Sequence, residues 1–428
     1  MACLKDLQFK VNRKDTNTMH ILIATPEFIT EDAFSGGLAN CVADFARIYA
    51  RKGNRVTIVT LSTKNKRIEW EQGIIIYGVK ADEYTIKERL INIFFPYYPL
   101  YKRINKKIKE ISGSEEISII HYPSSYALTI GRPKDVPAVV MMSTYLPIFR
   151  EVYKPEFNIN KRNIKSRGRL EKQIRRSIKK ADTIFAPSKI VAKYGELDTG
   201  KKIAVVESPV LVDEYVGESI LKDEKLKGKK YFLFFGTLGY LKGIALIAKV
   251  LQGLFEYNKD ICFVFLGEQT NMGTKKNPLM AMDYVYSKVP KKYHFRIIYK
   301  EKTRDKFLLY SIVSNAVACV LPSRFDNLPN TCIEAMALGK VVIGTKKASF
   351  DELITDNVNG FLIDVDNEEQ LLEKLKQILK MSGEQLQSMG ENARKIIKRL
   401  DPETIYPQLM QFYQYTINEY KRKKGDGV

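Results

Sequence analysis

The sequence has 428 residues, of which 45% are hydrophobic and 28% charged, and its formal net charge is +21. This length predicts two or three domains with apolar cores. Its longest apolar runs fall well short of the roughly 18 residues that a membrane-spanning helix needs. The five scattered cysteines form no CxxC pair, which favours buried thiols over a disulfide framework or a zinc site. The positive charge predicts an anionic partner: nucleic acid, an anionic membrane face or a phosphorylated substrate.

The first residues contain no apolar core typical of a secretory signal peptide. Met19 resembles a natural start, so we expect residues 1–18 to be a loose N-terminal extension. Reduced cysteines and the missing signal core predict a cytoplasmic protein.

Short apolar runs rich in β-branched residues alternate with segments of helical period from Met19 onward. This alternation is typical of a parallel sheet covered by helices. A helix is expected over 38–53. The expected strands of the first half are 20–25, 55–60, 73–78, 117–122, 138–143, 183–188 and 203–208.

A charged, turn-prone stretch at 217–230 separates these strands from a second series. The strands expected there are 231–236, 262–267, 295–300, 318–323, 341–345 and 360–365. The sequence thus predicts an α/β protein with two Rossmann-like domains, 19–215 and 216–403. A closing helix over 404–424 is expected to return to the first. Open parallel sheets bind ligands at the carboxyl ends of their strands, so we expect the site there.

Glycines follow the first strand of each half. Gly36 and Gly37 precede a helix, where a backbone without side chains can approach a phosphate. Lys242, before Gly243, stands at the start of another expected helix, where the helix dipole disfavours a cation. A bound anion such as a diphosphate would explain that lysine, although a solvent-exposed side chain is an equally simple interpretation.

Two acidic residues flank the loop in PSRFDNLPNTCIEAMALGKVVIGT, which covers residues 322–345. Thr331 and Glu334 fit a capping box, in which each side chain satisfies an amide of a new helix. That interpretation leaves Asp326 unexplained.

The histidines and a pair of aspartates also bear on function. His121 ends a predicted strand, where it either faces a ligand or is a satisfied core imidazole. His20 and His294 are interpreted as structural. Asp364 and Asp366 resemble a metal clamp, but Asp366 is better explained as the N-cap of the next helix.

Two segments suit a membrane surface. Residues 161–180 hold ten basic residues and one acid along a thin apolar stripe, and 90–111 combine aromatics with lysines. Both patterns are typical of peripheral contact with anionic lipid headgroups, and a solvated helix or a buried segment explains them about as well. No nucleic-acid recognition motif is present, so a nucleic-acid partner is not expected.

With these residues assembled, the chain resembles the retaining glycosyltransferases of family four, which have the GT-B fold, from about Met19 to Tyr420. The segment 322–345 carries the most specific part of the likeness. Supporting motifs are Gly36-Gly37, His121 before Pro123, Ala181-Asp182, Lys242-Gly243 and Phe350-Asp351-Glu352. The resemblance implies two domains facing across a deep cleft and a nucleotide-diphosphate sugar as co-substrate. It implies no cofactor and no metal.

The resemblance also implies residue roles. Glu334 would bind the ribose, Asp326 the transferred sugar and Lys242 the diphosphate. His121 would act from the first domain. The remaining donor-binding residues would be Gly36, Gly37, Thr237, Tyr299, Lys300, Asn330 and Thr331. The implied reaction moves a hexose-type sugar to a lipid-linked or surface-polysaccharide precursor at the inner membrane face.

Three positions depart from the family pattern. Asp326 stands where glutamate is common, Thr237 where arginine is common, and Pro329 removes an amide donor from the loop. Two other functions stay open at this point. One is a sugar-nucleotide epimerase of related architecture, and the other is a non-catalytic basic protein that binds membrane or nucleic acid.

Overall fold

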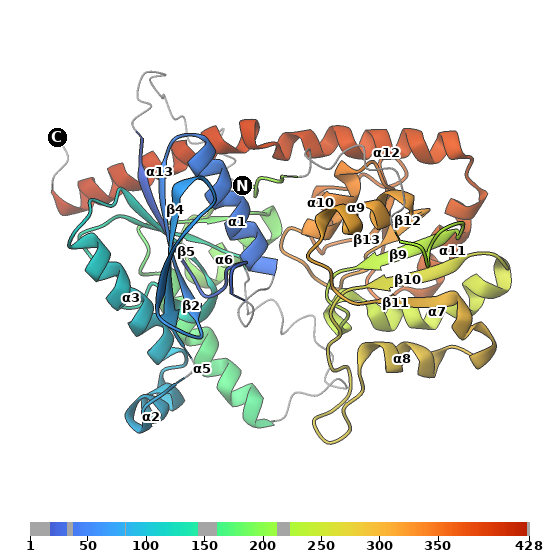
Figure 1. Cartoon of the computed structure of the whole chain (residues 1–428), viewed down its shortest axis with the longest axis horizontal. Coiled ribbons are helices and arrows are strands. Elements are labelled where there is room, and N and C mark those ends of the chain that lie inside the picture. The colour runs from blue at the N-terminus through green and yellow to red at the C-terminus, as the bar shows by residue number, and fades with distance from the viewer. Residues whose placement is uncertain (1–17, 32–36, 82, 144–160, 212–222, 426–428) are drawn as a thin grey trace. The chain divides into compact units, whose positions relative to one another are not determined.

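The computed structural model describes residues 18–31, 37–81, 83–143, 161–211 and 223–425. They divide into two compact α/β units (Figure 1). One contains the described residues up to 143, then 161–209 and 402–425, and the other contains 210–401. No helix among the described residues is both long and apolar enough to cross a bilayer. The four cysteines in these ranges are all unpaired thiols.

The sheet of the first unit has the order β3-β4-β2-β1-β5-β6-β7-β8. All neighbours pair in parallel except β3 and β4, which are antiparallel. The strands are β1 His20–Thr25, β2 Arg55–Ser62, β3 Lys66–Trp70, β4 Ile74–Lys80, β5 Ile119–Pro123, β6 Ala138–Met141, β7 Thr183–Ala186 and β8 Ala204–Val205.

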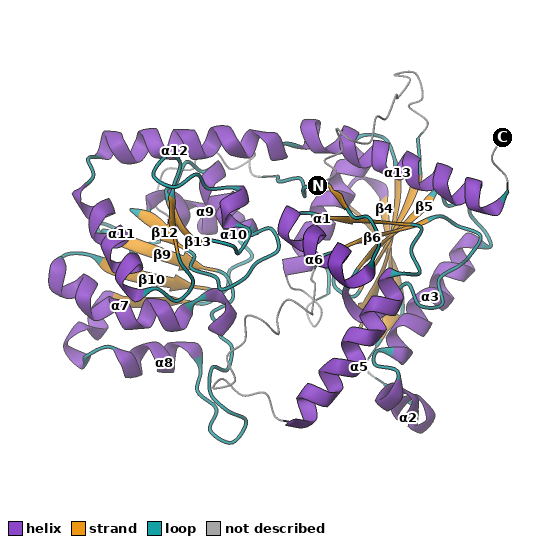
Figure 2. Cartoon of the chain, turned by 180° about the vertical axis from the view of Figure 1, so that it is seen from behind, coloured by secondary structure: helices purple, strands orange, loops and turns teal. Residues whose placement is uncertain are grey.

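Helices cover both faces of this sheet, with α1 and α3 on opposite sides (Figures 1 and 2). The central strand β1 is buried throughout, as expected for a strand covered on two faces. The helices are α1 Gly37–Arg51, α2 Ile86–Phe94, α3 Tyr98–Ser112, α5 Lys161–Ile178, α6 Lys189–Thr199 and α13 Pro402–Lys424.

The sheet of the second unit is fully parallel in the order β11-β10-β9-β12-β13-β14. Its strands are β9 Tyr231–Phe235, β10 Cys262–Leu266, β11 Ile297–Lys300, β12 Ala318–Val320, β13 Val342–Thr345 and β14 Phe361–Ile363. Its helices are α7 Ile244–Tyr257, α8 Ala281–Lys288, α9 Lys306–Asn315, α10 Asn330–Ala337, α11 Glu368–Lys380 and α12 Gly383–Ile397.

The two parallel Rossmann-like sheets confirm the predicted fold class. β3 is an addition that the sequence did not predict. It is a five-residue antiparallel strand in which exposed and half-buried residues alternate. Strand β5 runs from Ile119 through Pro123 where 117–122 was expected, so His121 lies in its middle and not at its end.

Candidate functional site

The strand order of the second unit reverses at β9, which lies between β10 and β12. The chain passes from β9 outward to β10 and β11, then returns to the other side of β9 as β12. The loops after β9 and β12 therefore lie next to each other at the carboxyl edge of the sheet. Such reversal points are where open α/β sheets bind ligands. Lys242 and Asp326 come from these two loops.

Backbone contact holds the two loops together. Gly243 has φ +79°, and a Cβ there would overlap the carbonyl oxygen of Pro322. The amide of Arg324 donates to the carbonyl of Leu241 at 2.8 Å. Gly243 is thus required both by its left-handed conformation and by this close approach. As a result, Lys242, the last residue of a short 3-10 turn, is fixed beside the loop that follows β12.

The Lys242 ammonium donates to the Asp326 carboxylate in an ion pair. The Lys242 side chain is 35% exposed and that of Asp326 18%, so both can be reached from solvent. The backbone of Asp326 is also anchored, because Ser349 Oγ donates to its carbonyl at 2.8 Å. The sequence proposed a role for each of these two residues, and the structure brings them together.

Glu334 lies on α10 and is turned toward α9. Its Oε1 accepts from Lys306 Nζ at 2.9 Å and from the Tyr310 hydroxyl at 3.2 Å. The predicted capping box is therefore wrong. Helix α10 begins at Asn330, its N-cap is Pro329, and no side chain caps it. The helix starts two residues upstream of the start that a Thr331 cap would give, so Thr331 lies inside the first turn and the Glu334 carboxylate is available for other contacts.

The remaining predicted donor residues lie around the same sheet edge. Thr331 lies close to Gly236, the residue after β9: a Cβ on Gly236 would be 3.4 Å from the Thr331 methyl group. Thr237 and Asn330 are exposed. Tyr299 donates to the carbonyl of Gly267 at 3.1 Å. Lys300 forms an ion pair with Asp223, in which both side chains are mostly buried.

In the first unit, Gly37 is the exposed first residue of α1. Gly36 lies outside the described residues. Neither the position of Gly37 nor its surroundings identifies a phosphate contact, since a Cβ there would meet nothing within 4 Å.

His121 is a buried residue in the middle of β5, with 2% of its surface exposed. Its Nδ1 lies 2.7 Å from the Tyr413 hydroxyl of α13, and its ring contacts those of Phe45 and Phe185. Burial lowers the pKa of His121 to about 3, so the imidazole is neutral. These contacts favour the core-imidazole interpretation.

The two aspartates after β14 have separate partners. Asp364 accepts from Gln370, whereas Asp366 forms an ion pair with Arg324. Asp366 is not the N-cap of α11, because that cap is Asn367, whose side chain accepts from the Gln370 amide. No cluster of three metal-ligating side chains occurs among the described residues.

Sequence reasoning missed Lys306, Tyr310, Arg324 and Ser349. Lys306 and Tyr310 are four residues apart on α9, a spacing that places both on one helix face. That spacing was the available signal, but only the fold shows that the face meets Glu334.

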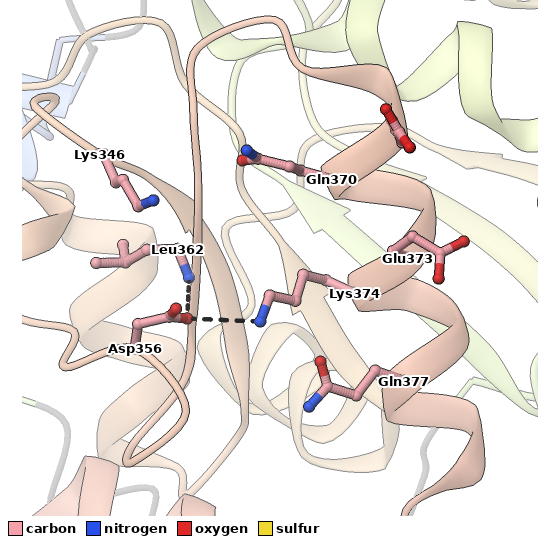
Figure 3. Close-up of a pocket in the computed structure, with 8 residues that line it drawn as sticks. Lys346, Asp356, Leu362, Gln370, Glu373, Lys374 and Gln377 are labelled. Atoms are coloured by element: carbon pink, nitrogen blue, oxygen red, sulfur yellow. Dashed lines mark hydrogen bonds and ion pairs between the residues drawn. The ribbon is translucent and has the colours of Figure 1, made fainter.

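A separate hollow lies between β14 and α11 (Figure 3). Asp356 is at its centre and accepts from the Leu362 amide at 2.9 Å, with Lys374 Nζ 3.9 Å away. None of the predicted site residues lines this hollow. Several of its charged side chains have ion-pair partners: Lys374 pairs with Asp356, Lys346 with Asp364 and Glu373 with Lys376.

Comparisons with known proteins agree with this fold. Residues 218–396 match the family model described as glycosyl transferases group 1, and residues 35–214 match that of glycosyltransferase family 4. Spore coat protein SA of Bacillus subtilis is 27% identical over 179 residues, which cover 42% of this chain and 46% of that protein. The N-acetylgalactosamine-N,N'-diacetylbacillosaminyl-diphospho-undecaprenol 4-alpha-N-acetylgalactosaminyltransferase of Campylobacter jejuni is 28% identical over 174 residues, or 39% of this chain and 41% of that enzyme.

The chain thus spans less than half the length of each of these two relatives. Among solved structures, sucrose-phosphate synthase from Thermosynechococcus elongatus has a TM-score of 0.72 at 15% identity, covering 93% of this chain and 98% of the other. That likeness shows the fold alone. The two family matches together cover both units, and the chain belongs to glycosyltransferase family 4, the glycosyl transferases group 1, with the GT-B fold.

Proposed function

We propose that this chain transfers a hexose-type sugar from a nucleotide-diphosphate sugar to an acceptor hydroxyl with retention of configuration. The observation that carries this function is the meeting of Lys242 and Asp326 at the reversal point of the second sheet. A cation and a carboxylate side by side suit a molecule that presents phosphate next to sugar hydroxyls.

The donor would lie along the edge formed by the loops after β9 and β12. Lys242 would take the diphosphate, and Asp326 would accept hydrogen bonds from the transferred sugar. Glu334 would accept from the ribose hydroxyls, because Lys306 and Tyr310 hold its Oε1 and orient the carboxylate. Thr237, Asn330 and Thr331 would contact the phosphates, with Tyr299 and Lys300 nearer the base. Gly36 and Gly37 would complete the phosphate contacts from the first unit.

In the proposed reaction, the bond from the anomeric carbon to the diphosphate breaks while a bond to the acceptor oxygen forms on the same face. The acceptor proton passes to the departing phosphate oxygen. Lys242 and the first amides of α10 would stabilise the charge that develops on that phosphate. His121 is not one of the proposed donor contacts, since its ring is enclosed by the core of the first unit.

The acceptor would be a lipid-linked or surface-polysaccharide precursor bound by the first unit at the inner membrane face. The name of the Campylobacter relative includes a diphospho-undecaprenol acceptor, which supports a lipid-linked glycan as the acceptor of this chain. Tyr126, which follows the carboxyl end of β5, lies against Tyr97 at the start of α3, with ring centroids 4.5 Å apart. Aromatic walls with a few polar groups are common in ligand sites.

A thermal-shift panel of UDP-, GDP-, ADP- and CMP-sugars tests the donor site. One of these donors should raise the melting temperature of the wild-type chain in proportion to its affinity. Lys242→Met should weaken its binding about tenfold or more, because a charge-assisted hydrogen bond to phosphate is lost. Lys249→Met is a matched control, since Lys249 forms a more exposed ion pair with Glu368 elsewhere in the second unit.

Nuclear magnetic resonance of the donor distinguishes the enzyme classes. Transfer requires an acceptor, and its product keeps the anomeric configuration of the donor. An isomer formed from donor alone would instead indicate an epimerase. Failure of every donor to bind, or equal binding by the Lys242→Met variant, would contradict the proposed function.

A further inference from the structure

Helix α2 carries an apolar face that no described neighbour covers. None of its residues is buried. Ile86 is 79% exposed, Leu90 57% and Phe94 66%. These three residues are four positions apart, so they form one stripe along the helix. Ile93 and Phe95 extend the stripe and are also exposed. We call these five side chains the apolar tip.

Polar contacts, not burial, hold α2 in place. A capping box formed by Thr85 and Glu88 begins the helix. Arg103 of α3 donates to Glu88 Oε2 at 3.0 Å and to the Lys80 carbonyl at 3.0 Å. The helix is therefore anchored on its polar side, and its apolar side faces away from the unit. An exposed apolar face on an anchored helix is typical of an interaction site, because leaving it in water is unfavourable.

Basic side chains border the apolar tip. Arg169 of α5 donates to the Ile93 carbonyl at 3.0 Å, and its guanidinium lies 5.9 Å from the Phe94 ring. The pictures show α2 beside the end of α3 and near α5 (Figures 1 and 2). Lys172 and Arg176 are exposed further along α5, and Lys87 and Arg89 on α2 itself.

Among the residues that the structure describes, the acids near the apolar tip are already matched. Glu88 pairs with Arg103, Glu83 pairs with Lys80, and Glu171 is buried beside Arg175. The charge presented around the apolar tip is therefore positive.

We propose that the apolar tip inserts into the headgroup region of an anionic membrane while Arg169 and Lys172 contact lipid phosphates. An apolar stripe flanked by cations matches the two layers of such a membrane, acyl chains below and anionic headgroups above. A second copy of the chain or a protein groove would satisfy the apolar stripe, but the surrounding positive charge favours anionic lipid. This surface gives the proposed lipid-linked acceptor its place of encounter, and it does not involve the donor residues.

Vesicle sedimentation of the full chain tests the surface. Wild-type protein should bind vesicles that contain phosphatidylglycerol more tightly than pure phosphatidylcholine vesicles, and high salt should reduce the difference. The double variant Leu90→Ser/Phe94→Ser should lower the partition coefficient about 100-fold, at about tenfold for each apolar side chain withdrawn from lipid. Leu197→Ser is its control, since Leu197 is 75% exposed on α6 away from the tip.

The charge contribution is tested in the same assay. Arg169→Gln/Lys172→Gln should weaken binding to phosphatidylglycerol vesicles and leave the weaker binding to phosphatidylcholine unchanged. Lys275→Gln/Lys276→Gln removes the same charge from an exposed loop of the second unit and should change neither.

A fluorescence measurement tests membrane insertion independently of the serine variants, in case one of them folds poorly. In Phe94→Trp, the new tryptophan should shift to shorter wavelength with phosphatidylglycerol vesicles and be quenched by brominated acyl chains. An unchanged spectrum, or equal vesicle binding by wild type and the tip variant, would overturn the proposal. A wild-type dimer that Leu90→Ser/Phe94→Ser converts to monomer would assign the tip to a second copy instead. Donor-induced thermal shifts measured on every variant separate failure of this surface from failure of the donor site.

Discussion

The Tyr413 hydroxyl lies 2.7 Å from Nδ1 of His121 and 2.7 Å from the Tyr49 hydroxyl. This buried chain of hydrogen bonds joins the C-terminal helix α13 to strand β5 and helix α1 of the first unit. All three side chains are almost inaccessible to water, so each polar atom depends on the others for its partner.

Tyr413→Phe should destabilise the first unit. The substitution removes a partner of both His121 and Tyr49, and an unsatisfied buried polar group costs about 1–3 kcal/mol. Trp70, the single tryptophan, lies in β3 and reports unfolding of this unit by its fluorescence. Tyr420→Phe removes a hydroxyl that donates to the Lys134 carbonyl at an exposed position of the same helix, and its effect should stay near 0.5 kcal/mol. Equal effects of the two substitutions would contradict the buried network.

The stability of the first unit should fall as the pH is lowered. Burial lowers the pKa of His121 to about 3, whereas a histidine in the unfolded chain titrates near 6.5. Between these values the unfolded chain binds a proton that the folded chain does not. The contribution is therefore complete above about pH 6.5 and is lost as the pH falls toward 3.

From pH 7 to pH 5 the loss from His121 should be about 2 kcal/mol. Urea unfolding followed by Trp70 fluorescence at both pH values measures it. His121→Asn should be less stable at pH 7 and lose less on acidification. It should not become pH-independent, because burial also lowers the pKa of His20. A pH dependence identical to that of wild type would show that His121 is not the titrating group.

Loss of the Lys242 ammonium should weaken the binding of nucleotide diphosphates more than the binding of nucleotide monophosphates. Lys242→Met should weaken binding of the nucleotide-diphosphate sugar about tenfold to 100-fold and change binding of the matching nucleoside monophosphate much less, since the proposed contact of Lys242 is to the outer phosphate. Isothermal titration with both ligands measures the ratio. A uniform loss for both would mean that Lys242 contacts another part of the donor.

Glu334 should determine the preference for ribose. A donor with 2'-deoxyribose should bind the wild-type chain more weakly by about tenfold or more, because a carboxylate built to accept a hydroxyl is left without one. Glu334→Gln should bind the ribose donor less tightly and discriminate less between the two sugars. Retained discrimination in that variant would remove Glu334 from the ribose contact.

Gly243→Ala should destabilise the second unit by about 2–6 kcal/mol and also weaken donor binding. The backbone of an alanine there would have to keep a positive φ, and its methyl group would collide with the Pro322 carbonyl. Each effect costs about 1–3 kcal/mol. Differential scanning calorimetry measures the stability. Gly383→Ala is the control, because a Cβ at the start of α12 would meet nothing within 4 Å. Comparable losses in both variants would contradict the role of the close approach.

Most of the fold could be predicted from the sequence because buried parallel strands are nearly continuous apolar runs. Five of the six residues of β1 are hydrophobic or threonine, and such a run has few other stable environments. β3 was not predicted, because its sequence KRIEW is short and is not a continuous apolar run. It forms a strand because it pairs with β4, and that contact cannot be seen in its own composition.

The sequence indicated that Lys242 and Asp326 follow the carboxyl ends of two strands, and the structure places the two side chains in contact, while their role stays a prediction. The candidate site was not predictable where a tertiary contact replaces a local one. Glu334 satisfies the spacing of a capping box, yet its carboxylate bonds to Lys306 and Tyr310 of another helix. Asp366 likewise fits an N-cap pattern, but its backbone has a positive φ of 55° and its carboxylate forms an ion pair with Arg324.

The return of α13 to the first unit has a consequence for synthesis on the ribosome. Residues 210–401, which form the second unit, are translated before α13. The partners of His121 and Tyr49 on α13 therefore emerge only after an entire α/β unit has been made. The second unit can complete its core during translation, whereas the first unit cannot complete its core until α13 has emerged from the ribosome.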